Sequence, residues 1–191
     1  MDKRLLRYLQ IGGPSLAEQE AGQLWDEARG LLDVATWQAR LDTPDFFQRF
    51  HPHAEGSAAL GRLLAPCRQV CLLVVTLGDR LERRARDYLD RREAFRGYIL
   101  DRLGSYLVEQ QMRGLDRQVS QAAQARGCAT TRRHSPGYGD FALEANRVFV
   151  ELASETLPGL EMSDGGLLRP EKTITALKGL GACLRITPTG S

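Results

Sequence analysis

The sequence has few of the residue types that bind metals or act as nucleophiles. Its 191 residues include only three histidines and four cysteines. The cysteines, at positions 67, 71, 128 and 183, are scattered and form no Cys-x-x-Cys pair, so a zinc site is not expected. His51 and His53 have the spacing of a ligand pair, but no adjacent cysteine, aspartate or third histidine accompanies them, and structural or surface roles are expected.

Strong charge and long apolar runs are also missing. The formal net charge is +2, whereas a dedicated nucleic-acid-binding protein usually has a strongly basic face. No apolar run approaches the roughly 20 residues that a membrane span needs, and the N-terminal residues lack the apolar segment of a signal peptide. These absences predict a cytoplasmic protein with reduced thiols and with neither nucleic acid nor membrane as its partner.

Several signatures of common enzyme classes are absent as well. The sequence has no Gly-x-Gly-x-x-Gly dinucleotide fingerprint, no Walker A lysine motif and no Gly-x-Ser-x-Gly nucleophile elbow. The working chemistry is therefore expected to depend on holding a ligand rather than on a nucleophile or a resident metal.

The length fits one domain spanning residues 1–191. Gly104 and Gly114 are expected to kink or break a long helical region at about 79–126, and Gly179 and Gly181 to loosen the C-terminal tail. Hydrophobic periodicity and breaker residues predict helices at about 2–10, 15–33, 57–64, 79–126 and 141–154, and strands at about 37–42, 70–77, 160–163 and 172–177. Residues 128–133 are expected to form a short extended approach to the following loop.

The most informative stretch, residues 131–140, reads Thr-Arg-Arg-His-Ser-Pro-Gly-Tyr-Gly-Asp. Pro136 fixes its own φ and biases Ser135 toward an extended conformation, and Gly137 permits backbone angles that other residues resist. Such a loop lets main-chain groups approach a ligand closely while Arg133 holds an anionic end. The same residues are also typical of a Pro-Gly turn that only reverses the chain.

This loop and four flanking segments share a pattern with a known family. Residues 133–138, Arg-His-Ser-Pro-Gly-Tyr, match the motif Arg-x-x-x-Gly-Tyr. The matching segments resemble the reactivation (S-adenosylmethionine-binding) domain of cobalamin-dependent methionine synthase, in its short stand-alone form. The flanking similarities are in segments 2–9, 74–79, 100–109 and 168–176.

The resemblance implies an α+β fold, with a twisted antiparallel sheet and packed helices, which agrees with the expected order of elements. It implies binding of S-adenosylmethionine (AdoMet) by Arg133, Ser135, Pro136, Gly137 and Tyr138. In this role the arginine clamps the carboxylate in a bidentate pair, and main-chain groups around the serine and first glycine read the adenine edge. The tyrosine ring meets the sulfonium side.

Two acidic residues, Glu109 and Asp140, are candidates to hold the ammonium or the ribose of the same ligand. The family's fully sized members differ from this chain in two places. They have a proline where this chain has Gly139, and a ligand-contacting tyrosine at a position that aligns near Lys178.

The resemblance further implies that AdoMet supports reductive remethylation, or reactivation, of a corrinoid cofactor. The sequence lacks the Asp-x-His-x-x-Gly motif of cobalamin-binding modules, so cobalamin would be held by a partner, a corrinoid-binding methyltransferase or a methionine synthase core. A flavodoxin-like protein or another reductant would supply the electron. Two alternatives are a non-catalytic AdoMet-binding or scaffold protein that has kept the fold, and an ordinary AdoMet-dependent methyltransferase, which the missing glycine motif disfavours.

Overall fold

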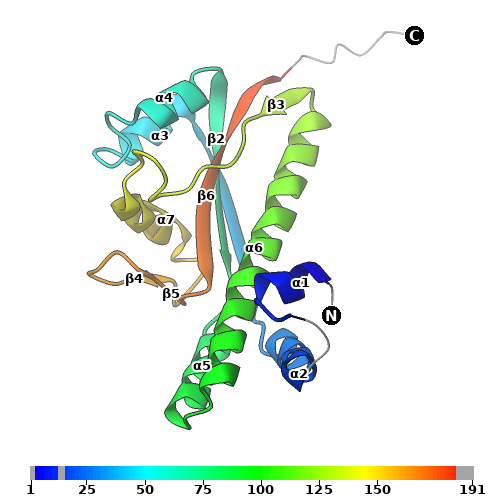
Figure 1. Ribbon diagram of the computed structural model, residues 1–191. Helices are drawn as coiled ribbons and strands as arrows, with labels where there is room; N and C mark the ends of the chain where they lie inside the picture. Colours follow the sequence, from blue (N-terminus) through cyan, green and yellow to red (C-terminus); the bar gives the residue numbers. More distant parts are fainter. Residues whose placement is uncertain (1–2, 13–15, 184–191) are drawn as a thin grey trace.

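The computed structural model describes residues 3–12 and 16–183 and has an α+β fold (Figure 1). The α-helices are α1 (Lys3–Tyr8), α2 (Leu16–Gly30), α3 (Thr43–Arg49), α4 (Ala58–Leu64), α5 (Arg80–Asp90), α6 (Ala94–Gln124) and α7 (Asn146–Ala153), the last preceded by a 3-10 turn at Leu143–Ala145. The strands are β1 (Ala35–Asp42), β2 (Cys67–Thr76), β3 (Cys128–Thr130), β4 (Glu161–Met162), β5 (Leu168–Arg169) and β6 (Thr173–Cys183).

The main sheet is antiparallel throughout, with strand order β1-β2-β6-β3, and β4 and β5 form a separate small hairpin. Strand β2 carries the continuous apolar run, and its residues from Val70 to Val75 are all buried. Both faces of this central strand are covered, which explains why its sequence shows no alternation of apolar and polar residues. The predicted antiparallel α+β fold is confirmed.

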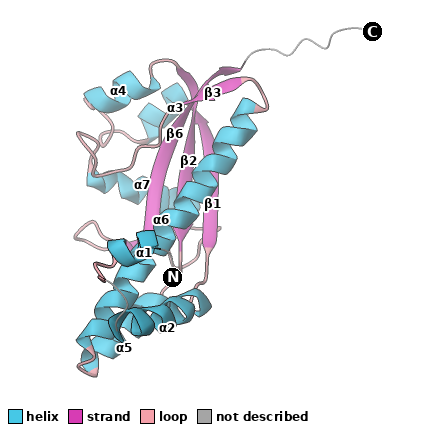
Figure 2. Ribbon diagram, turned by 45° about the vertical axis from the view of Figure 1, so that its right-hand side comes forward, coloured by secondary structure: helices cyan, strands magenta, loops and turns pink. Residues whose placement is uncertain are grey.

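Helices cover the two faces of the sheet with separate apolar cores. The α6-side core joins the odd residues of β2 to helix α6 and includes Leu73, Ile99, Leu103 and Ala176. The α7-side core joins the even residues of β2 to helices α3, α4 and α7. It contains Phe46, Phe50, Leu72, Phe141, Phe149 and Leu177. Figures 1 and 2 show α6 running along one face while α3, α4 and α7 lie against the other.

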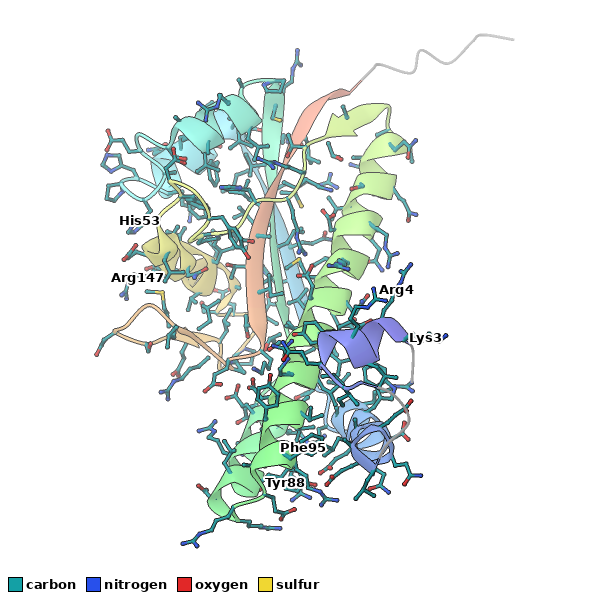
Figure 3. The ribbon with its side chains drawn as sticks, in the orientation of Figure 1. Lys3, Arg4, His53, Tyr88, Phe95 and Arg147 are labelled. Carbon is teal, nitrogen blue, oxygen red and sulfur yellow. The ribbon has the colours of Figure 1, made fainter. Side chains whose placement is uncertain are left out.

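Several details differ from the sequence-based expectations. The helical region at 79–126 is two helices, and the break lies at residues 91–93, where Arg92 has a φ of 62°, rather than at Gly104 or Gly114. Tyr88 and Phe95 lie on either side of this break (Figure 3). The segment at 43–49 is a helix that was not predicted.

Strand β6 is longer than predicted, because it continues through Gly179 and Gly181 to residue 183. A Cβ at residue 179 would collide with the Cys67 sulfur, so this glycine is required by close packing and does not loosen the tail. Cys67 and Cys71 are free, whereas Cys128 is disulfide-bonded, so the expectation of reduced thiols is wrong for that residue. Within residues 3–12 and 16–183, no helix combines the length and apolarity needed to cross a bilayer.

Two lysines of the last part of the chain tie β6 to helix α6. The Nζ of Lys178, whose side chain is 5% exposed, lies 2.6 Å from Asp116 Oδ1 and donates to Ser120 Oγ at 2.6 Å. The Nζ of Lys172 donates to Asp101 Oδ1, also at 2.6 Å. A buried charge is tolerated only with such partners, so these pairs fix the register between the helix and the strand.

Candidate functional site

The loop at residues 131–140 begins as an extension of strand β3 along the edge of β6. The Thr131 N–H donates to Gly179 O at 3.0 Å. His134 and Leu177 then exchange two main-chain hydrogen bonds, of 2.9 and 2.7 Å, in an isolated antiparallel bridge. Beyond this bridge the chain leaves the strand, and Pro136 has no N–H with which to continue the pairing.

The departure of the loop leaves part of the β6 edge open. The Lys172 carbonyl accepts a hydrogen bond from Leu77 N on the β2 side, while Leu177 pairs with the loop on the other side. Because main-chain groups alternate along a strand, the N–H and C=O groups of Thr173 and Thr175 face the loop side. An unpaired strand edge of this kind offers donors and acceptors to a ligand.

Hydrogen bonds within the loop hold it in a compact shape. The Gly137 N–H donates to Phe141 O at 2.8 Å, and the Tyr138 N–H donates to Ser135 O at 3.3 Å. Gly137 has a φ of 84°, a left-handed conformation that explains the glycine. The Gly137 N–H is therefore used inside the loop and is not open to a ligand, whereas the β6 edge offers main-chain donors.

Asp140 anchors the far end of the loop to helix α4. Its Oδ1 accepts from Ser57 Oγ at 2.6 Å and its Oδ2 from Ala59 N at 3.2 Å. The hydrogen bond from the serine hydroxyl is the largest influence, and together with the backbone donors at the helix start it lowers the pKa of Asp140. The carboxylate is thereby committed to holding the loop, which places it in a structural role.

The loop, the open edge and helices α4, α6 and α7 line a cavity of about 650 Å³. This volume falls in the range typical of small-molecule sites. Helix α6 contributes Glu109 and helix α7 contributes Asn146. The remaining lining residues are Ala59, Arg132, Arg133, His134, Ser135, Pro136, Tyr138, Gly139, Leu168, Thr173, Ile174 and Thr175.

An ion pair forms the charged end of this cavity. The Nη2 of Arg133 donates to both Glu109 oxygens, at 2.6 and 2.7 Å, and Arg113 Nε adds a third bond at 2.9 Å. Burial acts to raise the pKa of Glu109, but the hydrogen bonds from Arg133 and Arg113 act against it, and the pKa is lowered. Glu109 is therefore ionised at neutral pH.

The guanidinium of Arg133 is only partly satisfied by this pair. Its Nη1 is buried and has no hydrogen-bond partner within the described residues. The expected bidentate clamp therefore changes in form, because Nη2 already holds Glu109 and Nη1 is the donor left for an anion. The charged end of the cavity therefore presents one cationic donor, Arg133 Nη1, and one anionic acceptor, the Glu109 carboxylate. This pair complements the carboxylate and the ammonium group of an α-amino acid.

Of the other expected binding residues, Ser135, Pro136 and Tyr138 line the cavity, whereas Gly137 does not. Ser135 is half-buried, Pro136 is buried, and the Tyr138 side chain stands 68% exposed. Sequence reasoning missed Thr173, Thr175 and Asn146, which the fold brings to the same cavity. Thr175 Oγ1 donates to Asn146 Oδ1 at 2.6 Å, a pairing that spacing along the chain does not signal.

Among the described residues, neither the cysteines nor the His51 and His53 pair forms a metal site. Throughout the part of the chain that the structure describes, no three His, Cys, Asp or Glu side chains are grouped to hold a metal ion. A second cavity, of about 510 Å³, lies at the α3–α4 loop, which also carries His53 (Figure 3). Its His51 and Glu55 side chains are exposed and paired with each other, with Nε2 and Oε2 2.7 Å apart.

Comparison with known proteins places the fold but not the family. No protein-family model and no curated protein matches the sequence. Among solved structures, the chain is similar to the MetH reactivation domain bound to AdoHcy (S-adenosylhomocysteine), with a TM-score of 0.55 and 14% sequence identity. The alignment covers 93% of this chain and 68% of the other. The chain therefore has the fold of the MetH reactivation domain.

Proposed function

We propose that this protein binds AdoMet in the cavity between the loop, helix α6 and the β6 edge. The observation that carries the proposal is the Arg133–Glu109 pair with its free Nη1 donor, in the fold of a domain crystallised with AdoHcy. The amino-acid end of AdoMet carries a carboxylate and an ammonium group. Arg133 Nη1 would hold the carboxylate and Glu109 the ammonium.

The remaining parts of the ligand also find suitable partners. The main-chain edge at Thr173 and Thr175 can hydrogen-bond the nucleoside, and the cavity volume of about 650 Å³ suits a molecule of this size. Tyr138 stands at the cavity rim, where its exposed ring can contact the sulfonium by a cation–π interaction.

We further propose that bound AdoMet serves the reductive remethylation of a corrinoid held by a separate protein. AdoMet supplies an activated methyl group and leaves as AdoHcy, while a separate reductant keeps the acceptor competent. This chemistry needs no acid or base from the chain, whose part is to orient the sulfonium. The fold of the MetH reactivation domain and the site at the loop support this role.

One observation favours the alternative of an AdoMet-binding or scaffold protein without methyl transfer. Lys178 stands near the position where the resembling family has a ligand-contacting tyrosine. Its side chain does not line the cavity but is buried against Asp116 and Ser120 on helix α6. One contact of the family's ligand is therefore missing from this position.

A methyl-transfer assay separates the two functions. AdoMet carrying a labelled methyl group is mixed with reduced corrinoid and candidate corrinoid proteins, with and without this protein. Reactivation predicts label on the corrinoid that depends on the protein and is lost in Arg133→Ala. AdoMet binding without any label transfer, across corrinoid proteins encoded near this one, supports the scaffold function instead.

A further inference from the structure

Arg133 and His134 enter the cavity from opposite faces of the sheet. They are consecutive residues of an extended segment, so their side chains point in opposite directions. Arg133 reaches Glu109 on helix α6, whereas the His134 ring stacks on Phe141 of the α7-side core, with ring centroids 6.1 Å apart and an interplanar angle of 20°. The cavity that both residues line therefore wraps around the sheet edge and has two chemically different ends.

Both residues also contain a buried polar atom without a partner. Among the described residues, four side-chain atoms are buried and unpaired, namely Arg102 Nε, Asp116 Oδ1, Arg133 Nη1 and His134 Nε2. Asp116 Oδ1 is compensated by Lys178 Nζ at 2.6 Å, and Arg102 does not line the cavity. The remaining two lie in adjacent residues of one cavity. Buried polar atoms are rarely left unsatisfied, so this pairing points to a ligand.

We propose that His134 holds the nucleoside end of the ligand, while Arg133 and Glu109 hold its amino-acid end. This assignment rests on the proposed AdoMet site. The Nε2 of a neutral imidazole acts as donor or acceptor according to its tautomer, and a nucleoside offers both kinds of group on its base and ribose. Asn146 and Thr175 line the same cavity and form a hydrogen-bonded pair, which adds fixed polar groups beside the nucleoside.

The arrangement has a consequence for the free protein. Among the described residues, His134 Nε2 is a buried polar atom without a hydrogen-bond partner, so it is expected to add little to the stability of the ligand-free fold. A residue of similar shape without that nitrogen should leave the fold intact or stabilise it, while it weakens ligand binding. Opposite effects on stability and affinity are the signature of a binding residue, since loss of a structural contact lowers both.

The test compares His134→Phe, which keeps a ring to stack on Phe141, with the wild-type protein. Calorimetry with AdoHcy should show an affinity roughly 3- to 10-fold weaker, the size expected for one lost hydrogen bond. Adenosine should lose affinity by a similar factor, and methionine should bind unchanged. The melting temperature without ligand should equal or exceed that of the wild type. His53→Phe, on the α3–α4 loop away from the cavity, is the matched control.

The outcomes separate this assignment from the proposed function. If wild-type protein and His134→Phe bind AdoHcy equally well, the His134 assignment is overturned and the AdoMet site stands. If His134→Phe weakens adenosine and methionine by the same factor, or lowers the ligand-free melting temperature, its role is structural and the assignment is also overturned. If wild-type protein binds no AdoHcy, the proposed function fails and the His134 assignment fails with it.

Discussion

Replacing Glu109 by glutamine tests whether the charged end of the cavity is built as the structure shows. The carboxylate accepts two bonds from Arg133 and one from Arg113, and its side chain is 31% exposed. The Glu109→Gln side chain keeps nearly the same shape but loses the negative charge. Its amide nitrogen would also face the donors of Arg133, so at least one of these bonds is lost.

The expected cost follows from the burial of the pair. Hydrogen bonds to charged groups contribute about 1.5–3 kcal/mol, and partial exposure of both side chains reduces this figure through solvent screening. We therefore expect Glu109→Gln to lower the free energy of unfolding by about 1–2 kcal/mol, which corresponds to ~2–8 °C in melting temperature for a chain of this size.

The pH dependence of this cost has a definite sign. The pKa of Glu109 is lower in the folded state than its ordinary value of about 4.3. A group with a depressed folded-state pKa contributes stability that is fully present above the unfolded pKa and is lost as the pH falls through the folded one. The difference between wild type and Glu109→Gln should therefore be constant at neutral pH and shrink as the solution is acidified below the ordinary glutamate value.

Urea unfolding followed by circular dichroism measures the difference directly. Glu155→Gln is the matched control, because Glu155 is exposed and forms no ion pair among the described residues. The assigned role of the Glu109 carboxylate is refuted if Glu109→Gln is no less stable than the control at neutral pH. It is equally refuted if the difference between Glu109→Gln and wild type does not shrink on acidification.

Two further predictions concern the loop and the buried lysine, and both are measured by urea unfolding. Gly137→Ala should lower the free energy of unfolding by about 1–2 kcal/mol, because the φ of 84° is left-handed and a Cβ would lie 3.1 Å from Leu143 Cδ1. Gly114 lies in open space on helix α6, so Gly114→Ala should raise the free energy of unfolding by about 0.5–1 kcal/mol. Equal effects of the two alanines would contradict this reading. Lys178→Met should lower the free energy of unfolding by about 2–3 kcal/mol, because it leaves Asp116 unpaired. Most of this loss should be recovered when Asp116→Leu is added. No recovery in the double variant would contradict the role of the Lys178–Asp116 pair.

The sequence predicted those helices and strands whose apolar pattern can be recognised from neighbouring residues alone. The apolar run at 70–77 indicated a buried strand, and the long amphipathic stretch indicated helix α6. Gly179 was expected to loosen the tail, because glycine permits many backbone conformations. Only the packing of Cys67 against β6 shows why glycine is needed within this strand. The break at residues 91–93 was likewise missed, since neither glycine nor proline marks it.

The candidate site likewise combines features that are local in the sequence with contacts between distant residues. The backbone chemistry of residues 131–140 is local, and the sequence indicated a ligand-holding loop there. The partners of the loop are not local, because Glu109 lies 24 residues from Arg133 and the open edge at Thr173 and Thr175 arises from strand pairing. The role of Asp140 at the start of helix α4 depends on contacts more than 80 residues apart, which spacing alone does not encode.

The most direct test of the AdoMet site is calorimetric titration of wild-type protein and Arg133→Ala with AdoHcy. We expect one binding site in the wild type and a loss of about 1.5–3 kcal/mol in the variant, roughly 10- to 150-fold in affinity, for the lost bond to the ligand carboxylate. Arg147→Ala, exposed on helix α7 (Figure 3), should bind like the wild type. Absence of binding to the wild type at millimolar ligand, or equal binding by wild type and Arg133→Ala, would contradict an AdoMet site at Arg133.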